Sequence, residues 1–178
     1  MKAVRSLIWL AAIAAMFAPG CLRLDGQEAI PAHKSNTLYL TIAMEKERVR
    51  AGESPKALLT LMNLTDHVIQ IGDCANPPTL VWVQGERGDP PTTAWGRGAM
   101  GRLLPGEPEL PCTLNVPFPL SPGATTTRGF ILGAFYDLHE PGRYKVYLDV
   151  PSAEGLLRTD TVAFEVTAGD PAKDKKTQ

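Results

Sequence analysis

Apolar and polar residues alternate along the middle of the chain, and this alternation predicts β-strands. In residues 38–44 every second side chain is apolar, which places Leu38, Leu40, Ile42 and Met44 on one face. A period of two is typical of a strand with one buried face. The pattern recurs in residues 144–150 and 162–167, and more weakly in residues 56–64, 68–73, 79–84, 110–116 and 125–132. No long segment has helical spacing, so the chain is predicted to form an all-β antiparallel sandwich of about seven or eight short strands.

Residues 144–150 show the clearest alternation. The predicted inward set is Tyr144, Val146, Leu148 and Val150, whereas Lys145 and Asp149 are predicted to face water. The turn signal at residues 140–142 lets Tyr144 enter the core at the start of the strand. A buried tyrosine hydroxyl needs a backbone partner, an arrangement similar to the tyrosine corner of immunoglobulin folds. The alternative is a tyrosine at the surface.

Short motifs near the turns resemble those of a known group of domains. They are Val49-x-Ala51-Gly52-Glu53, Leu59-Thr60-Leu61 with Asn63-x-Thr65, Leu120-x-Pro122-Gly123, and Leu138-x-x-Pro141-Gly142-x-Tyr144-x-Val146. The set is similar to bacterial extracytoplasmic immunoglobulin-like domains, including domains related to the BsuPI proteinase inhibitor. The resemblance implies an immunoglobulin-like sandwich over residues 36–168, and a binding, adhesive or scaffold module rather than an enzyme. It transfers no inhibitory residue, because these motifs are structural.

Residues 1–20 are predicted to be a secretory signal peptide. Two basic residues precede an apolar run over residues 7–18, which is too short to span a bilayer as a helix. Gly20-Cys21 then resembles a bacterial lipobox, which implies that Cys21 carries a lipid and anchors the mature protein to a membrane. The two residues before Gly20 depart from the usual lipobox. Cleavage by an ordinary signal peptidase and an uncleaved anchor therefore stay open as alternatives.

The chain has three cysteines, an odd number for an exported protein. If Cys21 carries a lipid, Cys74 and Cys112 remain as one pair, and we expect them to form a disulfide in an oxidising compartment. Such a bridge would stabilise the fold by about 4 kcal/mol in the chain-entropy model, less any strain. Three free thiols are the alternative.

Residues 21–35 are predicted to be a tether and residues 169–178 a disordered tail. The formal net charge of -1 becomes more negative once the two basic residues of the signal are removed. A mildly acidic chain lacks the dense basic surface that neutralises phosphates, which argues against nucleic acid as a partner. The length that remains suits one domain with its own core.

Residues 85–111 are rich in glycine and proline and are predicted to form a long loop without a regular strand or helix. Loops on a rigid sandwich often carry recognition, and aromatic and arginine side chains dominate binding hot spots. Trp95, Arg97 and Arg102 are therefore candidate binding residues, although Trp95 has the alternative of packing over an open edge of the sandwich. Residues 96–101 match a GxGxxG string, but flanking prolines argue against the strand and helix that a dinucleotide site needs.

Other chemistry is sparse in the sequence. The three histidines lack the spacing that puts ligands around zinc, and no GxSxG, HExxH or P-loop motif is present. We therefore predict no catalytic residue, no metal and no cofactor. Asn63-Leu64-Thr65 matches an N-glycosylation acceptor, yet it also has the composition of a hairpin turn.

The sequence supports three hypotheses about function. The leading one is a noncatalytic immunoglobulin-like module, lipid-anchored at the cell envelope or else periplasmic or secreted, that binds an envelope protein or polysaccharide or acts as a scaffold. The second is an inhibitor of an extracytoplasmic protease that inserts residues 85–111 into the cleft of the enzyme. The third is an enzyme whose site residues meet only in space.

Overall fold

The computed structural model describes residues 30–31, 35–71, 79–107 and 118–169 of the 178-residue chain. Within them the chain forms eleven strands and two short helices. The strands are β1 (Ile30–Pro31), β2 (Leu38–Met44), β3 (Arg48–Arg50), β4 (Lys56–Asn63), β5 (Ile69–Ile71), β6 (Leu80–Gly85), β7 (Phe118–Leu120), β8 (Thr125–Ile131), β9 (Gly142–Ser152), β10 (Gly155–Arg158) and β11 (Val162–Thr167). The helices are α1 (Ala94–Ala99) and α2 (Leu132–Phe135).

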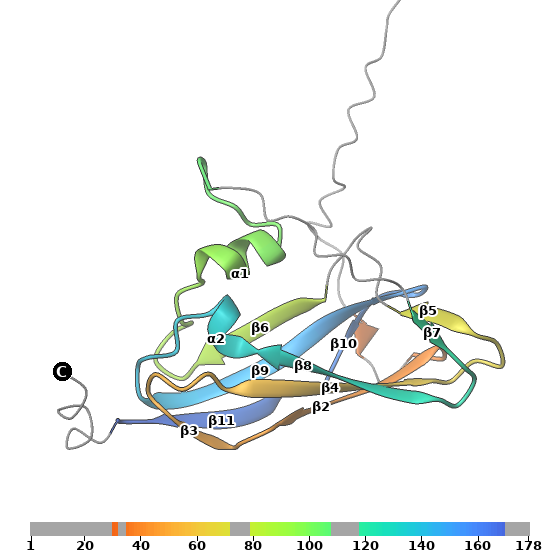
Figure 1. Ribbon diagram of the computed structural model, residues 1–178, viewed down its shortest axis with the longest axis horizontal. Helices are drawn as coiled ribbons and strands as arrows, with labels where there is room; N and C mark the ends of the chain where they lie inside the picture. Colours follow the sequence, from red (N-terminus) through yellow and green to blue (C-terminus); the bar gives the residue numbers. More distant parts are fainter. Residues whose placement is uncertain (1–29, 32–34, 72–78, 108–117, 170–178) are drawn as a thin grey trace, which may run out of the picture.

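Two sheets pack against each other to form a sandwich (Figure 1). The smaller sheet has the order β2-β4-β8, and its pairs are antiparallel. The larger sheet is built around β9, which pairs antiparallel with β6 along one edge and with β10 and β11 along the other. β5 and β7 form a short antiparallel pair of their own. The all-β antiparallel sandwich predicted from the alternation is confirmed.

The N-terminal part of the sandwich changes from one sheet to the other. β2 pairs with β4 in the smaller sheet, whereas β3 pairs in parallel with β11 in the larger one. Between them, the backbone nitrogen of Glu45 still donates to the carbonyl oxygen of Lys56 at 2.9 Å. The carbonyl oxygen of Glu47 then accepts from the nitrogen of Glu165 at 2.8 Å. This crossing ties the two sheets together and covers an edge that would otherwise be unpaired.

The inward side chains of both sheets form one core. Alternate positions of β4 are buried, as the period of two predicts. The core side chains with almost no exposure include Leu59, Leu61, Val81, Val146, Leu148 and Leu157. Full burial of a leucine or valine side chain stabilises the fold by about 2 kcal/mol relative to an exposed position. A shift of one residue in any of these strands would turn that side chain to solvent, so the pattern fixes the register.

Tyr144 lies in the core, with 6% of its surface exposed. Its hydroxyl donates to the carbonyl oxygen of Glu140 at 2.7 Å, and its ring stacks on Phe164 with centroids 5.5 Å apart. Burial raises the pKa of the hydroxyl, which therefore stays protonated and able to donate. The predicted core tyrosine with a backbone partner is confirmed.

Of the five described strands of two to four residues, only β5 falls within a predicted strand, at residues 68–73. The alternation does not reveal β1, β3, β7 or β10, because a strand this short has too few residues to show a period of two. β1 falls within the predicted tether at residues 21–35 and pairs in parallel with β10. The predicted strand at residues 110–116 lies outside the described residues.

The prediction that residues 85–111 contain no regular helix is wrong, because α1 forms within them. Thr93 caps its N-terminus, where the side-chain oxygen accepts from the backbone nitrogen of Gly96 at 2.9 Å. Gly101, with a φ of 67°, follows the end of the helix. A helix of six residues is too short to show a helical period, and its stability comes from its cap and its packing.

The packing partner of α1 is α2, which lies next to it outside the sheets (Figure 1). Gly96 is buried against the backbone of Phe135, and a Cβ at position 96 would lie 2.2 Å from the carbonyl oxygen of Phe135. The backbone nitrogen of Thr93 donates to that same oxygen at 2.9 Å. The glycine that opens the GxGxxG string is therefore required by helix packing.

The predicted lipidation of Cys21 and the predicted disulfide between Cys74 and Cys112 lie outside the described residues. Most of the predicted tail lies outside them as well. Within the part of the chain that the structure describes, no helix is both long enough and apolar enough to cross a bilayer.

Candidate functional site

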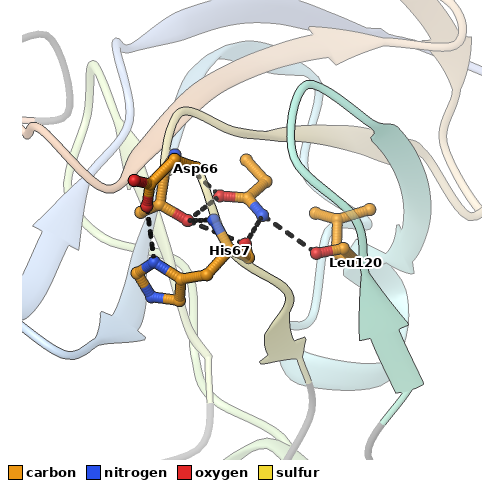
Figure 2. Close-up of polar contacts among 5 residues, drawn as sticks. Asp66, His67 and Leu120 are labelled. Carbon is orange, nitrogen blue, oxygen red and sulfur yellow. Dashed lines mark hydrogen bonds and ion pairs between the residues drawn. The ribbon is translucent and has the colours of Figure 1, made fainter.

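Within the described residues, two clusters of polar and aromatic side chains adjoin the apolar core, and the first is the turn after β4 (Figure 2). Asn63 is fully buried, and its side-chain nitrogen donates to the carbonyl oxygens of His67 at 2.8 Å and Leu120 at 2.9 Å. Its side-chain oxygen accepts from the backbone nitrogen and the hydroxyl of Thr65, at 2.9 and 2.7 Å. Asn63 therefore joins the turn to β7, and its buried amide is not accessible as a glycosylation acceptor.

Asp66 and His67 form an exposed pair in the same turn (Figure 2). Nδ1 of His67 lies 3.0 Å from a carboxylate oxygen of Asp66, and this hydrogen bond lowers the pKa of Asp66. The described residues contain no group of three or more histidine, cysteine, aspartate or glutamate side chains that could hold a metal ion. A solvated pair of this kind is a weak basis for a site.

The second cluster lies on the outer face of the larger sheet. Trp82 in β6 is in register with Tyr147 in β9, and their rings stack with centroids 6.1 Å apart and 17° between the planes. The guanidinium of Arg102 lies 4.4 Å from the centroid of Trp82, and that of Arg158 lies 4.6 Å from the centroid of Tyr147. We call these four residues the aromatic ladder, because a cation covers the ring at each end.

Asp149 is buried beside the ladder, with 2% of its surface exposed. One carboxylate oxygen accepts from Nε1 of Trp82 and from Nη2 of Arg158, both at 2.9 Å. The other oxygen accepts from Nε of Arg158 at 2.8 Å. The prediction that Asp149 faces water is therefore wrong. The residue occupies an outward position of β9, but its neighbours on β6 and β10 cover the carboxylate and satisfy it.

Arg102 reaches the ladder from a segment whose two ends are held together. We call residues 94–107 the clamped segment, because Arg97 near its start pairs with Glu107 at its end. Nε of Arg97 lies 3.0 Å from both carboxylate oxygens of Glu107, and Nη2 donates to one of them as well. The two side chains are only 22% and 17% exposed. A two-pronged pair of this kind fixes the geometry of both partners.

Glu107 also orders the turn that precedes it. The backbone nitrogen of Leu104 donates to the carboxylate at 2.9 Å, and the nitrogen of Glu107 donates to the carbonyl oxygen of Leu104 at 3.0 Å. The hydrogen bonds from Arg97 and from the Leu104 nitrogen lower the pKa of Glu107 to about 2. The part of the segment that follows α1 projects away from the sheets (Figure 1). Its backbone is thus both protruding and internally bonded.

The three binding residues predicted from the sequence have three different environments. Trp95 is 46% exposed, and its ring meets Phe135 at a steep angle with centroids 4.7 Å apart. Arg97 is engaged by Glu107 and also donates to the carbonyl oxygen of Thr92 at 2.5 Å. Arg102 is exposed and lies over Trp82. The structure therefore assigns Arg97 to the clamp and leaves Trp95 and Arg102 at the surface.

Four residues of this region are not among the site residues predicted from the sequence, namely Trp82, Tyr147, Asp149 and Arg158. Trp82 and Tyr147 fall at outward positions of two predicted strands, where a large aromatic residue is a usable signal of a special surface. The signal is incomplete, because neither strand reveals which residue of the other lies opposite to it.

Comparisons with known proteins add little to this geometry. No protein-family model matches the chain, and no curated protein matches it. Solved structures of a β-glucosidase from Listeria innocua are similar to it at a low level. The glucose complex has a TM-score of 0.39 and 18% identity over 73% of this chain. The gluconolactone complex has a TM-score of 0.36 and 20% identity over 73%. The chain spans 16% of the length of each, and the likeness assigns no function.

Proposed function

We propose that this protein is a noncatalytic β-sandwich module of the cell envelope that binds a protein or polysaccharide partner through the clamped segment. The observation that supports this most is that the backbone of the segment is hydrogen-bonded while some of its large apolar side chains are exposed. Its backbone is tied down, while Trp95 and Leu104 remain 46% and 54% exposed. Tryptophan and arginine dominate binding hot spots, and this segment presents Trp95 together with Arg102.

Three local devices hold the segment in one conformation before any partner arrives. Thr93 caps α1, Gly96 packs on α2, and Arg97 closes the ends through Glu107. A binding element that is ordered in the free protein loses less conformational entropy when it binds. The segment is therefore suited to recognition as a fixed surface on a rigid sandwich.

Photo-crosslinking tests this proposal directly. A photo-reactive amino acid at position 95 should form an adduct with one envelope component in cells that make the protein. Position 39 provides the matched control, because Tyr39 is also an aromatic residue, is 50% exposed and lies on β2 of the other sheet. Equal capture from both positions, or none from position 95 in a folded protein, would contradict the proposal.

Affinity measurements give the second arm of the test. With the captured component purified, Trp95→Ala should weaken binding per folded molecule by at least about tenfold, as truncation of a hot spot does. Tyr39→Ala should leave the affinity unchanged. If Trp95→Ala instead lowers the melting midpoint strongly and binding per folded molecule is unchanged, Trp95 is a cover for α2 and not a recognition residue.

The envelope location is also part of the proposal, and it rests on the Gly20-Cys21 junction. Cys21→Ser should release the protein into the soluble fraction or block its processing. Mass spectrometry of the first mature residue is the measurement. A soluble wild-type protein without acyl mass on that residue would leave a secreted or periplasmic module.

Inhibition of a protease is the second candidate function, and the projecting turn at residues 104–107 favours it. A protruding, internally bonded turn can enter a cleft without being ordered first. Trypsin is a suitable probe, because Arg102 is exposed on this segment. An inhibitor should reduce trypsin activity in proportion to its concentration and lose this effect in Arg102→Gln. Rapid cleavage after Arg102 without loss of trypsin activity would overturn this candidate.

A further inference from the structure

We propose that the partner is a protein segment that carries a carboxylate next to an apolar side chain, and that Arg102 binds this carboxylate. This inference rests on the proposed function, whose binding element it refines. The arginines around the ladder and the clamp differ in whether they bind a carboxylate.

Two of these arginines already hold a carboxylate on two nitrogens each. Arg97 holds Glu107, and Arg158 holds Asp149. Arg102 differs, because its guanidinium has no carboxylate within 4 Å among the described residues. Its hydrogen bond to Arg97 is made by the backbone nitrogen, at 2.7 Å. Among the described residues, the close contact of this side chain is with the ring of Trp82.

The position of Arg102 over the ring of Trp82 leaves its donors available. A guanidinium carries its five N–H groups in its own plane, so contact between that plane and a ring does not consume them. A carboxylate accepts two parallel hydrogen bonds from such a group. Because Asp149 and Glu107 are already neutralised by their own arginines, they do not cancel the charge of Arg102. A carboxylate is the group that completes this site.

The ring contacts favour a protein over a polysaccharide. A sugar that stacks on an aromatic residue needs a bare ring face, and in the ladder a guanidinium group lies over the ring of Trp82 and another over the ring of Tyr147. Two exposed apolar side chains, Trp95 and Leu104, lie on the clamped segment that carries Arg102. A cation with apolar side chains on the same fixed segment matches a peptide that alternates acidic and apolar residues.

Fluorescence anisotropy with defined probes tests the inference on the full mature chain. The first probe is a labelled peptide of alternating glutamate, leucine and glycine, and the second has glutamine in place of glutamate. Polygalacturonate is the third probe and represents an acidic polysaccharide. Arg102→Gln is the test variant. Arg50→Gln is its matched control, since Arg50 is an exposed arginine of β3 and the same charge is lost.

We expect the glutamate peptide to bind at least about tenfold more tightly than the glutamine peptide, and this advantage to disappear in Arg102→Gln. Arg50→Gln should change the affinity by less than about twofold, and added salt should weaken the glutamate peptide selectively. Circular dichroism of each variant confirms that the sandwich is folded.

Three results would overturn the inference. They are equal affinity for the two peptides, an advantage of glutamate that survives in Arg102→Gln, and tighter Arg102-dependent binding of polygalacturonate than of the peptide. If any of them occurs while position 95 still captures its component and position 39 does not, the proposed function stands and the carboxylate inference alone fails. Loss of the position 95 adduct would instead remove the proposed function itself.

Discussion

The two ends of the aromatic ladder make the same kind of ring contact and differ in what else the cation does. Arg158 lies over Tyr147 and at the same time holds Asp149 at 2.8 and 2.9 Å. Arg102 lies over Trp82 and holds no carboxylate among the described residues. One guanidinium is satisfied within its own sheet, and the other keeps its donors.

This difference follows from the backbone that carries each arginine. Arg158 is opposite Asp149 in the register of β10 and β9, so strand pairing itself brings the two charges together. Arg102 comes from the clamped segment, which is positioned by α1 and by the Arg97 pair. A cation satisfied inside a sheet contributes to the fold, whereas a fixed cation without an anion is available to a partner.

The largest loss of stability should come from removing the carboxylate that Arg158 binds. Asp149→Ala leaves Nε1 of Trp82 and the guanidinium of Arg158 without their acceptor in a place where the aspartate is 2% exposed. Removing one partner of a buried pair is costly because the other stays behind, and we expect a loss of about 3 kcal/mol. Urea unfolding at neutral pH is the measurement.

Asp149→Asn is the matched variant for this prediction. Its side-chain oxygen can still accept from Trp82, so the loss should be about half that of Asp149→Ala. If both variants are as stable as the wild type, the ladder is not a structural element at this end, and the comparison between Arg158 and Arg102 has no basis.

Asp149 also shows which features of β9 the sequence predicts and which it does not. The alternation of residues 144–150 correctly predicts β9 and its inward side chains, because burial of every second residue is a local pattern. It fails for Asp149, because the covering side chains come from β6 and β10 and depend on register. The core positions of a strand long enough to show the period are therefore predictable from that strand alone, while the outer face is a property of the assembled sheet.

The second prediction concerns the packing of α1 on α2, which positions the segment that carries Arg102. Gly96→Ala places a methyl group 2.2 Å from a backbone oxygen of Phe135, which cannot move aside as a flexible side chain can. We expect α1 to separate from α2 at a loss of about 2 kcal/mol, a cost typical of overpacking. Near-ultraviolet circular dichroism should report the lost contact between Trp95 and Phe135. An unchanged spectrum and unchanged stability would mean that α1 does not depend on this contact.

The clamped segment was only partly predictable. Its position as a binding candidate follows from its composition, and Trp95 and Arg102 do lie at the surface. The short helix, the role of Gly96 and the pairing of Arg97 depend on contacts with α2 and with Glu107, which have no periodic signature. A local sequence pattern does not predict single contacts between residues that are far apart in the chain.

The third prediction uses pH to loosen the clamp. The pKa of Glu107 is about 2 in the folded protein, below its ordinary value of 4.5. A depressed folded pKa means that the unfolded chain binds the proton first, so the stabilisation is complete above about pH 4.5 and is lost as the pH falls toward 2. The difference in urea midpoint between wild type and Glu107→Gln should be constant from pH 7 to pH 5 and shrink below that. A difference that grows on acidification would contradict the clamp.

The smallest loss of stability should come from removing Arg102 from the ring of Trp82. This variant tests the comparison between Arg102 and Arg158 most sharply. Arg102→Gln removes an exposed cation from a ring, which costs about 0.5 kcal/mol. Arg158→Gln, on a ring at nearly the same distance, also deprives the buried Asp149 of its two-pronged partner, so it should cost about 2 kcal/mol. Paired urea titrations of the two variants give the ratio directly. If both lose the same stability, Arg102 is a structural residue like Arg158, and its free donors cease to be an argument for a partner. If Arg158→Gln loses more and Arg102→Gln loses only binding, the same cation–ring contact serves the fold at one end of the ladder and recognition at the other.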